Sequence, residues 1–219
     1  MQLPIYLFKK NTPSIIIRTL YKLLFFLLLL SAAPAFAQKV WYVNINATGA
    51  NDGSSWTNAF TDLKTIEIRA KIGDQIWVAK GIYSPGATAV SSFILQDGVK
   101  IYGGFAGIET SLSQRDLSKI RTVNETILHG KKEVSDIASY HVVSNTADLT
   151  NATLLDGFTI TGGAAASATN SNPGANYFGG GIYNTSGSPV FNNLWIKGNS
   201  AVYGGGMYNT GSPLLSNVL

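Results

Sequence analysis

The acidic residues and histidines are the side chains of this sequence that could perform acid–base chemistry. Hydrolysis of a glycosidic bond uses two carboxylates roughly 5 to 9.5 Å apart, and a lyase needs carboxylates for calcium together with a base. From residue 157 to residue 219 the chain contains no Asp or Glu. The upstream candidates are single residues spread along the chain, namely Arg115, Asp116, Glu133, Asp136 and Asp156. We interpret them as turn and surface charges and assign no catalytic residue.

Metal and cofactor chemistry has little support in the sequence. The chain has no Cys, which excludes a thiolate metal site and a Cys nucleophile. His129 and His141 each follow apolar residues, so a metal or general-base role competes with that of an ordinary strand or turn histidine. Residues 179–181 and 204–206 are glycine triplets that could cradle a phosphate, but neither a Lys nor a helix follows them, which favours tight corners. We therefore expect no metal and no cofactor.

The net charge of +4 at first suggests a nucleic-acid or membrane-surface partner. Four of the 16 basic residues, Lys9, Lys10, Arg18 and Lys22, fall within the first 37 positions, which contain no acid. The remainder then carries 12 basic and 12 acidic residues. A neutral chain without a basic patch does not predict nucleic-acid binding.

The N-terminal segment has the pattern of a secretory signal. The basic stretch precedes an apolar run over 23–30 and a small-residue segment over 31–37, in which Ala35 and Ala37 form an A-x-A-like cleavage site. We expect Gln38 to begin the mature chain. The alternative is an N-terminal anchor, although the apolar run is shorter than the roughly 20 residues that span a bilayer. No later segment resembles a membrane span, so we expect an extracellular or outer-membrane-surface location.

Short apolar runs bounded by turn residues predict a chain made mostly of β-strands. The run over 40–43 has the clearest strand character, and similar runs recur as far as 158–161. Only the segment 58–71 has apolar residues at helical spacing, at Phe60, Leu63, Ile66 and Ala70. We expect this helix to cover the core that the first strands would otherwise expose at the N-terminal end of the fold.

An internal repeat indicates how these strands associate. The segment 179–185 recurs as 204–210 at an offset of 25, and Ser188-Pro189 recurs as Ser212-Pro213 at an offset of 24. A unit this short cannot bury its own apolar face, so neighbouring units must stack. Stacking predicts a parallel β-helix in which like lies on like, namely Ile182 over Met207, Asn184 over Asn209, Val190 over Leu214 and Leu194 over Val218.

The repeat also resembles a known family. The motif Ile196-x-x-Asn199-x-Ala201-x-x-Gly204-Gly-Gly-Met-Tyr208 is similar to the Phe-x-x-Asn and Gly-Gly-x-Ile/Tyr repeats of polymorphic outer-membrane proteins, with Ile196 where Phe is usual. Five upstream motifs resemble the leading portion of secreted Bacteroidetes-type β-helix proteins: Asp52-Gly-Ser-Ser-Trp56, Gly73-Asp-Gln-Ile-Trp-Val-Ala79, Val99-Lys-Ile-Tyr-Gly-Gly-Phe-Ala-Gly107, Ser113-Gln-Arg-Asp116 and Leu155-Asp-Gly-Phe-Thr-Ile-Thr-Gly-Gly163. The resemblance implies an all-β, pectate-lyase-like, right-handed parallel β-helix with one N-terminal capping helix.

The same resemblance leaves two functions open. Residues 1–37 would be a signal peptide, and residues 38–219 a β-helix domain that stops inside a repeat and thus looks truncated beside longer family members. One hypothesis is an exported, adhesin-like, non-catalytic surface protein that binds glycans or partner proteins along its flank. The alternative is the N-terminal part of a polysaccharide lyase or glycoside hydrolase, because the superfamily also contains such enzymes.

Three aromatic residues of the repeats are the candidate ligand contacts. Tyr183 and Tyr208 are 25 residues apart and should stack on adjacent strands about 4.8 Å apart. Trp195 should face outward, because it alternates with the apolar residues on either side. Such an outward strip could stack on sugar rings. The alternative is a structural ladder, with Trp195 covered by residues 164–177, which we expect to loop out as an insertion.

Overall fold

The fold is described from a computed structural model, which places residues 38–131, 136–165 and 174–219. The chain divides into two units, Met1–Ala37 and Gln38–Leu219. The division coincides with the expected cleavage point between Ala37 and Gln38, but the first unit lies outside the described residues. Signal-peptide cleavage therefore stays a prediction, and the description below concerns the second unit.

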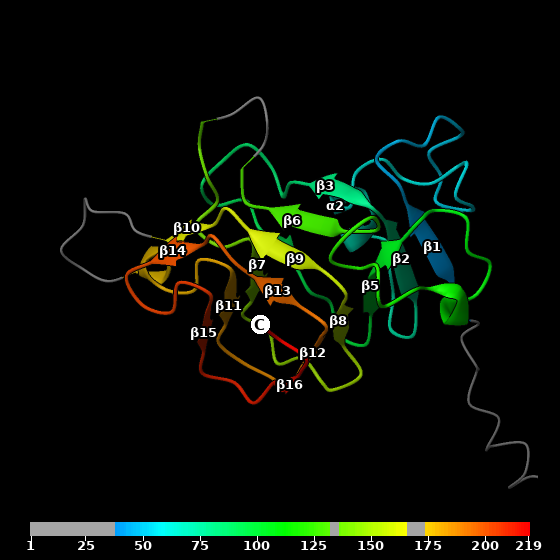
Figure 1. Cartoon of the computed structure of the whole chain (residues 1–219). Coiled ribbons are helices and arrows are strands. Elements are labelled where there is room, and N and C mark those ends of the chain that lie inside the picture. Colours follow the sequence, from blue (N-terminus) through cyan, green and yellow to red (C-terminus); the bar gives the residue numbers. More distant parts are fainter. Residues whose placement is uncertain (1–37, 132–135, 166–173) are drawn as a thin grey trace, which may run out of the picture. The chain divides into compact units, whose positions relative to one another are not determined.

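Most of the regular elements in the described part of the second unit are short parallel strands (Figure 1). Their sequences are rich in β-branched and aromatic residues and are separated by Gly, Asn and Ser turns, as strand formation requires. In chain order the elements are β1 (Val40–Val43), α2 (Lys64–Glu67), β2 (Gln75–Ala79), β3 (Gly81–Tyr83), β4 (Phe93–Ile94), β5 (Lys100–Phe105), η1 (Leu112–Gln114), β6 (Thr126–His129), β7 (Val143–Asn145), β8 (Leu154–Asp156), β9 (Thr159–Thr161), β10 (Ala164–Ala165), η2 (Ala175–Tyr177), β11 (Ile182–Asn184), β12 (Val190–Asn192), β13 (Trp195–Ile196), β14 (Ser200–Ala201), β15 (Met207–Asn209) and β16 (Leu214–Ser216).

These strands form four parallel sheets in the described part of the chain. The strand orders are β1-β2-β5-β8-β12-β16, β15-β11-β7-β4, β13-β9-β6-β3 and β10-β14. Register between the repeats follows the like-on-like expectation, with Ile182 opposite Met207, Asn184 opposite Asn209 and Val190 opposite Leu214. The pairing predicted from the 24- to 25-residue offset is thus confirmed at these three positions.

The expected fold class, an all-β right-handed parallel β-helix with one capping helix, is wrong. The strands belong to four separate sheets of six, four, four and two strands, without the single closed solenoid of uniform repeat that was expected. In the six-stranded sheet, Gln75 pairs with Lys100, Lys100 with Leu154, Leu154 with Val190 and Val190 with Leu214, so successive offsets are 25, 54, 36 and 24 residues. The short period holds only locally, and the described part of the domain is a multi-sheet assembly of parallel strands with one short α-helix.

The predicted helix over 58–71 is reduced to one turn, Lys64–Glu67. Phe60 instead forms a parallel bridge with Val43, since its N–H donates to Tyr42 O and its carbonyl accepts from Asn44 N. This bridge holds the backbone extended where the sequence pattern predicted a helix. The four apolar residues at helical spacing are nevertheless buried in the main core, as their spacing predicted, namely Phe60, Leu63, Ile66 and Ala70.

Two apolar clusters hold the sheets together. The main core runs through the domain from Val43 to Leu194 and includes Phe158 and Phe191, which are fully buried. A smaller cluster lies around Trp77, Tyr102 and Phe105.

The segment expected to loop out, 164–177, begins as β10, which pairs Ala164 with Ser200 and Ala165 with Ala201. The expectation of an unpaired insertion is therefore wrong for its first two residues. The prediction for residues 166–173 lies outside the described part of the chain.

Candidate functional site

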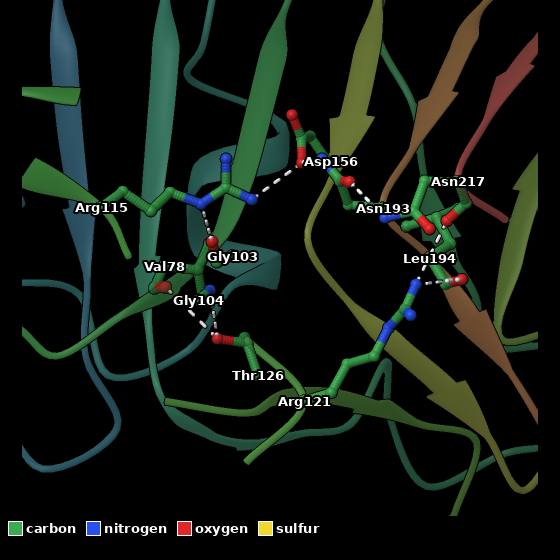
Figure 2. A network of polar contacts seen from close by, with 10 residues as sticks. All are labelled: Val78, Gly103, Gly104, Arg115, Arg121, Thr126, Asp156, Asn193, Leu194 and Asn217. Carbon is green, nitrogen blue, oxygen red and sulfur yellow. Dashed lines mark hydrogen bonds and ion pairs between the residues drawn. The ribbon is translucent and has the colours of Figure 1, made fainter. Parts of the chain in front are cut away.

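A buried ion pair contains two of the charged residues that the sequence pointed to (Figure 2). Arg115 Nη2 donates to Asp156 Oδ1 at 2.8 Å, and Arg115 Nε donates to Gly103 O at 2.6 Å. Both side chains are at most one-tenth exposed. Their interpretation as surface charges is wrong, because Arg115 folds back from the segment after β5 onto β8. Neither side chain is open to a substrate, so the pair serves structure.

A chain of amide hydrogen bonds continues from this pair toward the C-terminal strands (Figure 2). Asn193 Nδ2 donates to Asp156 Oδ1 at 2.9 Å, and Asn217 Nδ2 donates to Asn193 Oδ1 at 2.7 Å. Both asparagines have a left-handed backbone, φ 51°, which Asn tolerates better than other non-glycine residues. Arg121 Nη2 donates to the carbonyl oxygens of Leu194 and Asn217. These contacts bind the segment between β5 and β6 to the last repeat.

The other carboxylates are also held by local partners. Glu109 accepts hydrogen bonds from three successive backbone N–H groups, those of residues 106 to 108, and so closes its own loop. Hydrogen bonds from Thr150 lower the pKa of Asp97. Hydrogen bonds from Ser118 lower the pKa of Asp116 to about 2. Asp136 pairs with Lys131, while Glu133 lies outside the described residues.

Glu67 is the carboxylate with the most perturbed environment. It is the last residue of α2 and is buried, and this burial raises its pKa to about 7 against the opposing effect of the ion pair with Lys64. Its location among core residues gives it no access to a ligand. Sequence reasoning missed Glu67 because nothing in the pattern distinguished it from the exposed charges around it.

The two histidines lie in different settings. His129 Nδ1 faces the backbone of Lys131 in a turn. His141 is half-buried, faces the Gly179 carbonyl oxygen with Nδ1 at 3.0 Å, and stacks on Tyr183 with ring centroids 4.6 Å apart. Burial lowers the pKa of His141. Within residues 38–131, 136–165 and 174–219, no group of three His, Cys, Asp or Glu side chains could hold a metal ion.

Stacked rings follow the face of the sheet that contains β7, β11 and β15. Tyr183 and Tyr208 are register partners with ring centroids 5.9 Å apart and an interplanar angle of 17°. On the neighbouring strand β7 the register partner of Tyr183 is Ser144, which has no ring. His141 supplies the missing ring, stacked at 15° on Tyr183.

A second stack lies against the first. Phe178 and Tyr203 form an isolated parallel bridge, and their rings stack at 5.2 Å and 21°. Phe178 also contacts Tyr208 at 4.5 Å with a tilt of 44°. We call the connected rings His141, Phe178, Tyr183, Tyr203 and Tyr208 the aromatic face. Every member is at least partly exposed, and three of them were not singled out by the sequence as ligand contacts.

Trp195 is not part of the aromatic face. It lies on β13, in a different sheet, where it pairs with Thr159 of β9. Lys197 Nζ lies 3.3 Å from the centroid of its ring in a cation–π contact. The structure therefore brings together Tyr183 and Tyr208 but separates the third candidate, whose ring is covered on one side by a lysine.

Close backbone approach explains the first glycine triplet, residues 179–181, and Gly204 of the second. Gly179 and Gly204 have positive φ, 61° and 67°. A Cβ on Gly180 would collide with Ser200 O, and one on Gly181 would collide with Gly206 O. This supports tight corners between neighbouring strands and leaves no geometric basis for a phosphate cradle.

The aromatic face offers apolar ring surface and phenolic hydroxyl groups without a titrating carboxylate, which suits binding better than bond cleavage. In the part of the chain that the structure describes, no helix is long and apolar enough to cross a membrane. Comparison of the chain with protein-family models, with curated proteins and with solved structures found no match.

Proposed function

We propose that this chain is an exported, non-catalytic, adhesin-like binding protein that holds an uncharged glycan on its aromatic face. The observation that carries the proposal is the continuous contact of the five partly exposed rings of the aromatic face. Aromatic rings contribute a large apolar contact area, and the tyrosine hydroxyl adds a polar group at the rim. A glycan needs both, since it presents C–H and O–H groups together.

Charge supports an uncharged ligand. The three segments that bear the face, residues 137–147, 174–196 and 198–219, contain no Asp, Glu, Lys or Arg. An acidic polysaccharide would find no cation in these segments to offset the loss of water from its carboxylates. The face therefore favours neutral sugars.

The alternative of a lyase or hydrolase has weaker support. Asp156 is neutralised by Arg115 in a buried site, and Glu109 is saturated by backbone donors. Neither can act as an acid or base without breaking these contacts. No other observation favours an enzyme on the described surface.

The direct test is affinity electrophoresis of the exported full chain through gels that contain a neutral β-glucan, mannan or xylan, or acidic polygalacturonate. We expect retardation in at least one neutral gel, reduced by Tyr208→Ala and unchanged by Trp195→Ala, the control on the other sheet. Melting temperatures of both variants separate binding from folding. Retardation in none of the neutral gels would overturn the glycan proposal and direct attention to a partner protein. Release of reducing ends or of unsaturated sugars would overturn the non-catalytic part.

Export is tested separately. The proposal predicts that the mature chain recovered from outside the cytoplasm begins at Gln38, which N-terminal mass spectrometry measures directly. A chain that retains residues 1–37 would contradict this part of the proposal.

A further inference from the structure

The geometry points to Tyr203 as the ring on which a neutral pyranose stacks, an inference that rests on the proposed function. Tyr203 was not among the candidates found from the sequence. We infer that the remaining rings of the aromatic face support Tyr203 more than they contact the sugar, for the reasons that follow.

A sugar stacks on the face of an aromatic ring, and most faces in this array are already occupied. Tyr183 has His141 stacked on one side at 4.6 Å and Tyr208 on the other at 5.9 Å. Tyr208 also has Phe178 against it at 4.5 Å. Tyr183 therefore presents mainly its edge and hydroxyl group to the solvent, and Tyr208 has ring contacts with both Tyr183 and Phe178. The stacked rings stabilise the parallel strands, as the ladder alternative expected.

Tyr203 differs in its exposure. It is 55 % exposed, the largest value among the five rings, and stacks on Phe178 alone within the aromatic face. More than half of the residue is therefore accessible to a flat apolar partner. The exposed ring is nevertheless held in place, since Tyr203 N donates to Tyr177 O at 2.9 Å and Gly179 N donates to Tyr203 O at 2.9 Å. The hydrogen bonds hold the main chain of Tyr203, and the stack on Phe178 orients its ring. A side chain that is already oriented loses little conformational freedom on binding.

The backbone beside Tyr203 is also open. A Cβ placed on Gly205 or Gly206 would find its nearest neighbour at 3.4 or 3.5 Å, an ordinary contact distance, so these glycines are not required by crowding. Without side chains there, a ligand on the Tyr203 ring can approach the backbone that leads into β15.

The test uses the exported full chain and the neutral polysaccharide that retards it most strongly. We expect Tyr203→Ala to raise the dissociation constant about tenfold. Tyr203→Phe, which keeps the ring, should change it less than about threefold. Tyr183→Ala is the matched control. It should lower the melting temperature more than Tyr203→Ala does, because Tyr183 is stacked on both sides.

Each result has a separate meaning. Retention of the wild type with unchanged affinity in Tyr203→Ala would overturn this inference and leave the proposed function standing. Equal losses in Tyr203→Ala and Tyr203→Phe would show that the hydroxyl group, rather than ring stacking, provides the contact, which also overturns it. Absence of wild-type retention in every neutral gel would overturn the proposed function itself.

Discussion

Replacement of Asn184 by Ala tests the physical basis of the repeat. Asn184 is 0 % exposed and lies between two register partners of the same type. Its Oδ1 accepts from Asn145 Nδ2 at 2.7 Å, and its Nδ2 donates to Asn209 Oδ1 at 2.6 Å. The Ala variant removes both bonds at a position that water does not reach.

The magnitude follows from the partners that remain. Each buried hydrogen bond contributes about 1 kcal/mol net, and a stranded partner adds a desolvation cost. Asn145 Nδ2 keeps a second acceptor, Ser186 O at 2.8 Å, and Asn209 is exposed to water, so neither is fully stranded. We therefore expect Asn184→Ala to reduce the free energy of unfolding by about 2 to 3 kcal/mol. In a domain of this size, the melting temperature should fall by roughly 5 to 10 °C.

The assay is urea unfolding followed by circular dichroism, with Asn209→Ala as the matched control. Asn209 belongs to the same ladder, but it is exposed and its own Nδ2 donates only to Gly211 O. The control keeps the buried bond between Asn145 and Asn184 but takes the acceptor away from Asn184 Nδ2, so it should lose about 1 to 2 kcal/mol, less than Asn184→Ala. Equal losses in the two variants would refute the reasoning, because burial of the amide would then make no difference.

Three further predictions concern buried charge and pH. Because burial raises the pKa of Glu67 to about 7, the unfolded chain loses this proton first as pH rises from 4.5 to 7, so stability should fall over that range by up to about 3 kcal/mol. Glu67→Gln should abolish this decline in unfolding experiments at pH 4.5 and 8, and an unchanged slope would contradict the assignment. Burial lowers the pKa of His141, so the wild type should lose stability as pH falls below about 6.5. His141→Phe should lose less stability over the same range, and parallel pH profiles of the two proteins would contradict this. Arg115→Met leaves Asp156 buried without its cation and should lower the free energy of unfolding by about 3 to 5 kcal/mol. Arg115→Met combined with Asp156→Leu should recover much of that loss. Additive losses in the double variant would argue against the buried pair.

The sequence predicted local parallel pairing well where the same motif recurs. The register partners include Ile182 with Met207 and Asn184 with Asn209. They pair because the same motif appears twice, 25 residues apart. The pairing of Lys100 with Leu154 spans 54 residues and contains no repeat, so no pattern could extend the period across it. A regular solenoid was inferred from the two most similar units, whereas the offsets of 54 and 36 residues in the six-stranded sheet do not continue their period.

The candidate site was predicted only in part. Tyr183 and Tyr208 stack as their offset required. The other ring on Tyr183 is that of His141, which lies three residues before Ser144, the register partner of Tyr183. Strand alternation could not reveal this contact, because His141 precedes β7. The burial of Arg115 against Asp156 likewise joins residues 41 positions apart, for which single-sequence patterns carry no signal.

The most direct test of the binding account is an NMR titration of the exported full chain, in which the signals of its aromatic side chains are observed. The ligand is an oligosaccharide of the neutral glycan that retards the protein most strongly. We predict the largest ring-proton shifts at Tyr203, smaller shifts at Tyr208 and Phe178, and none at Trp195. Ligand-dependent shifts centred on Trp195 and Lys197, with the aromatic face unchanged, would contradict the central claim.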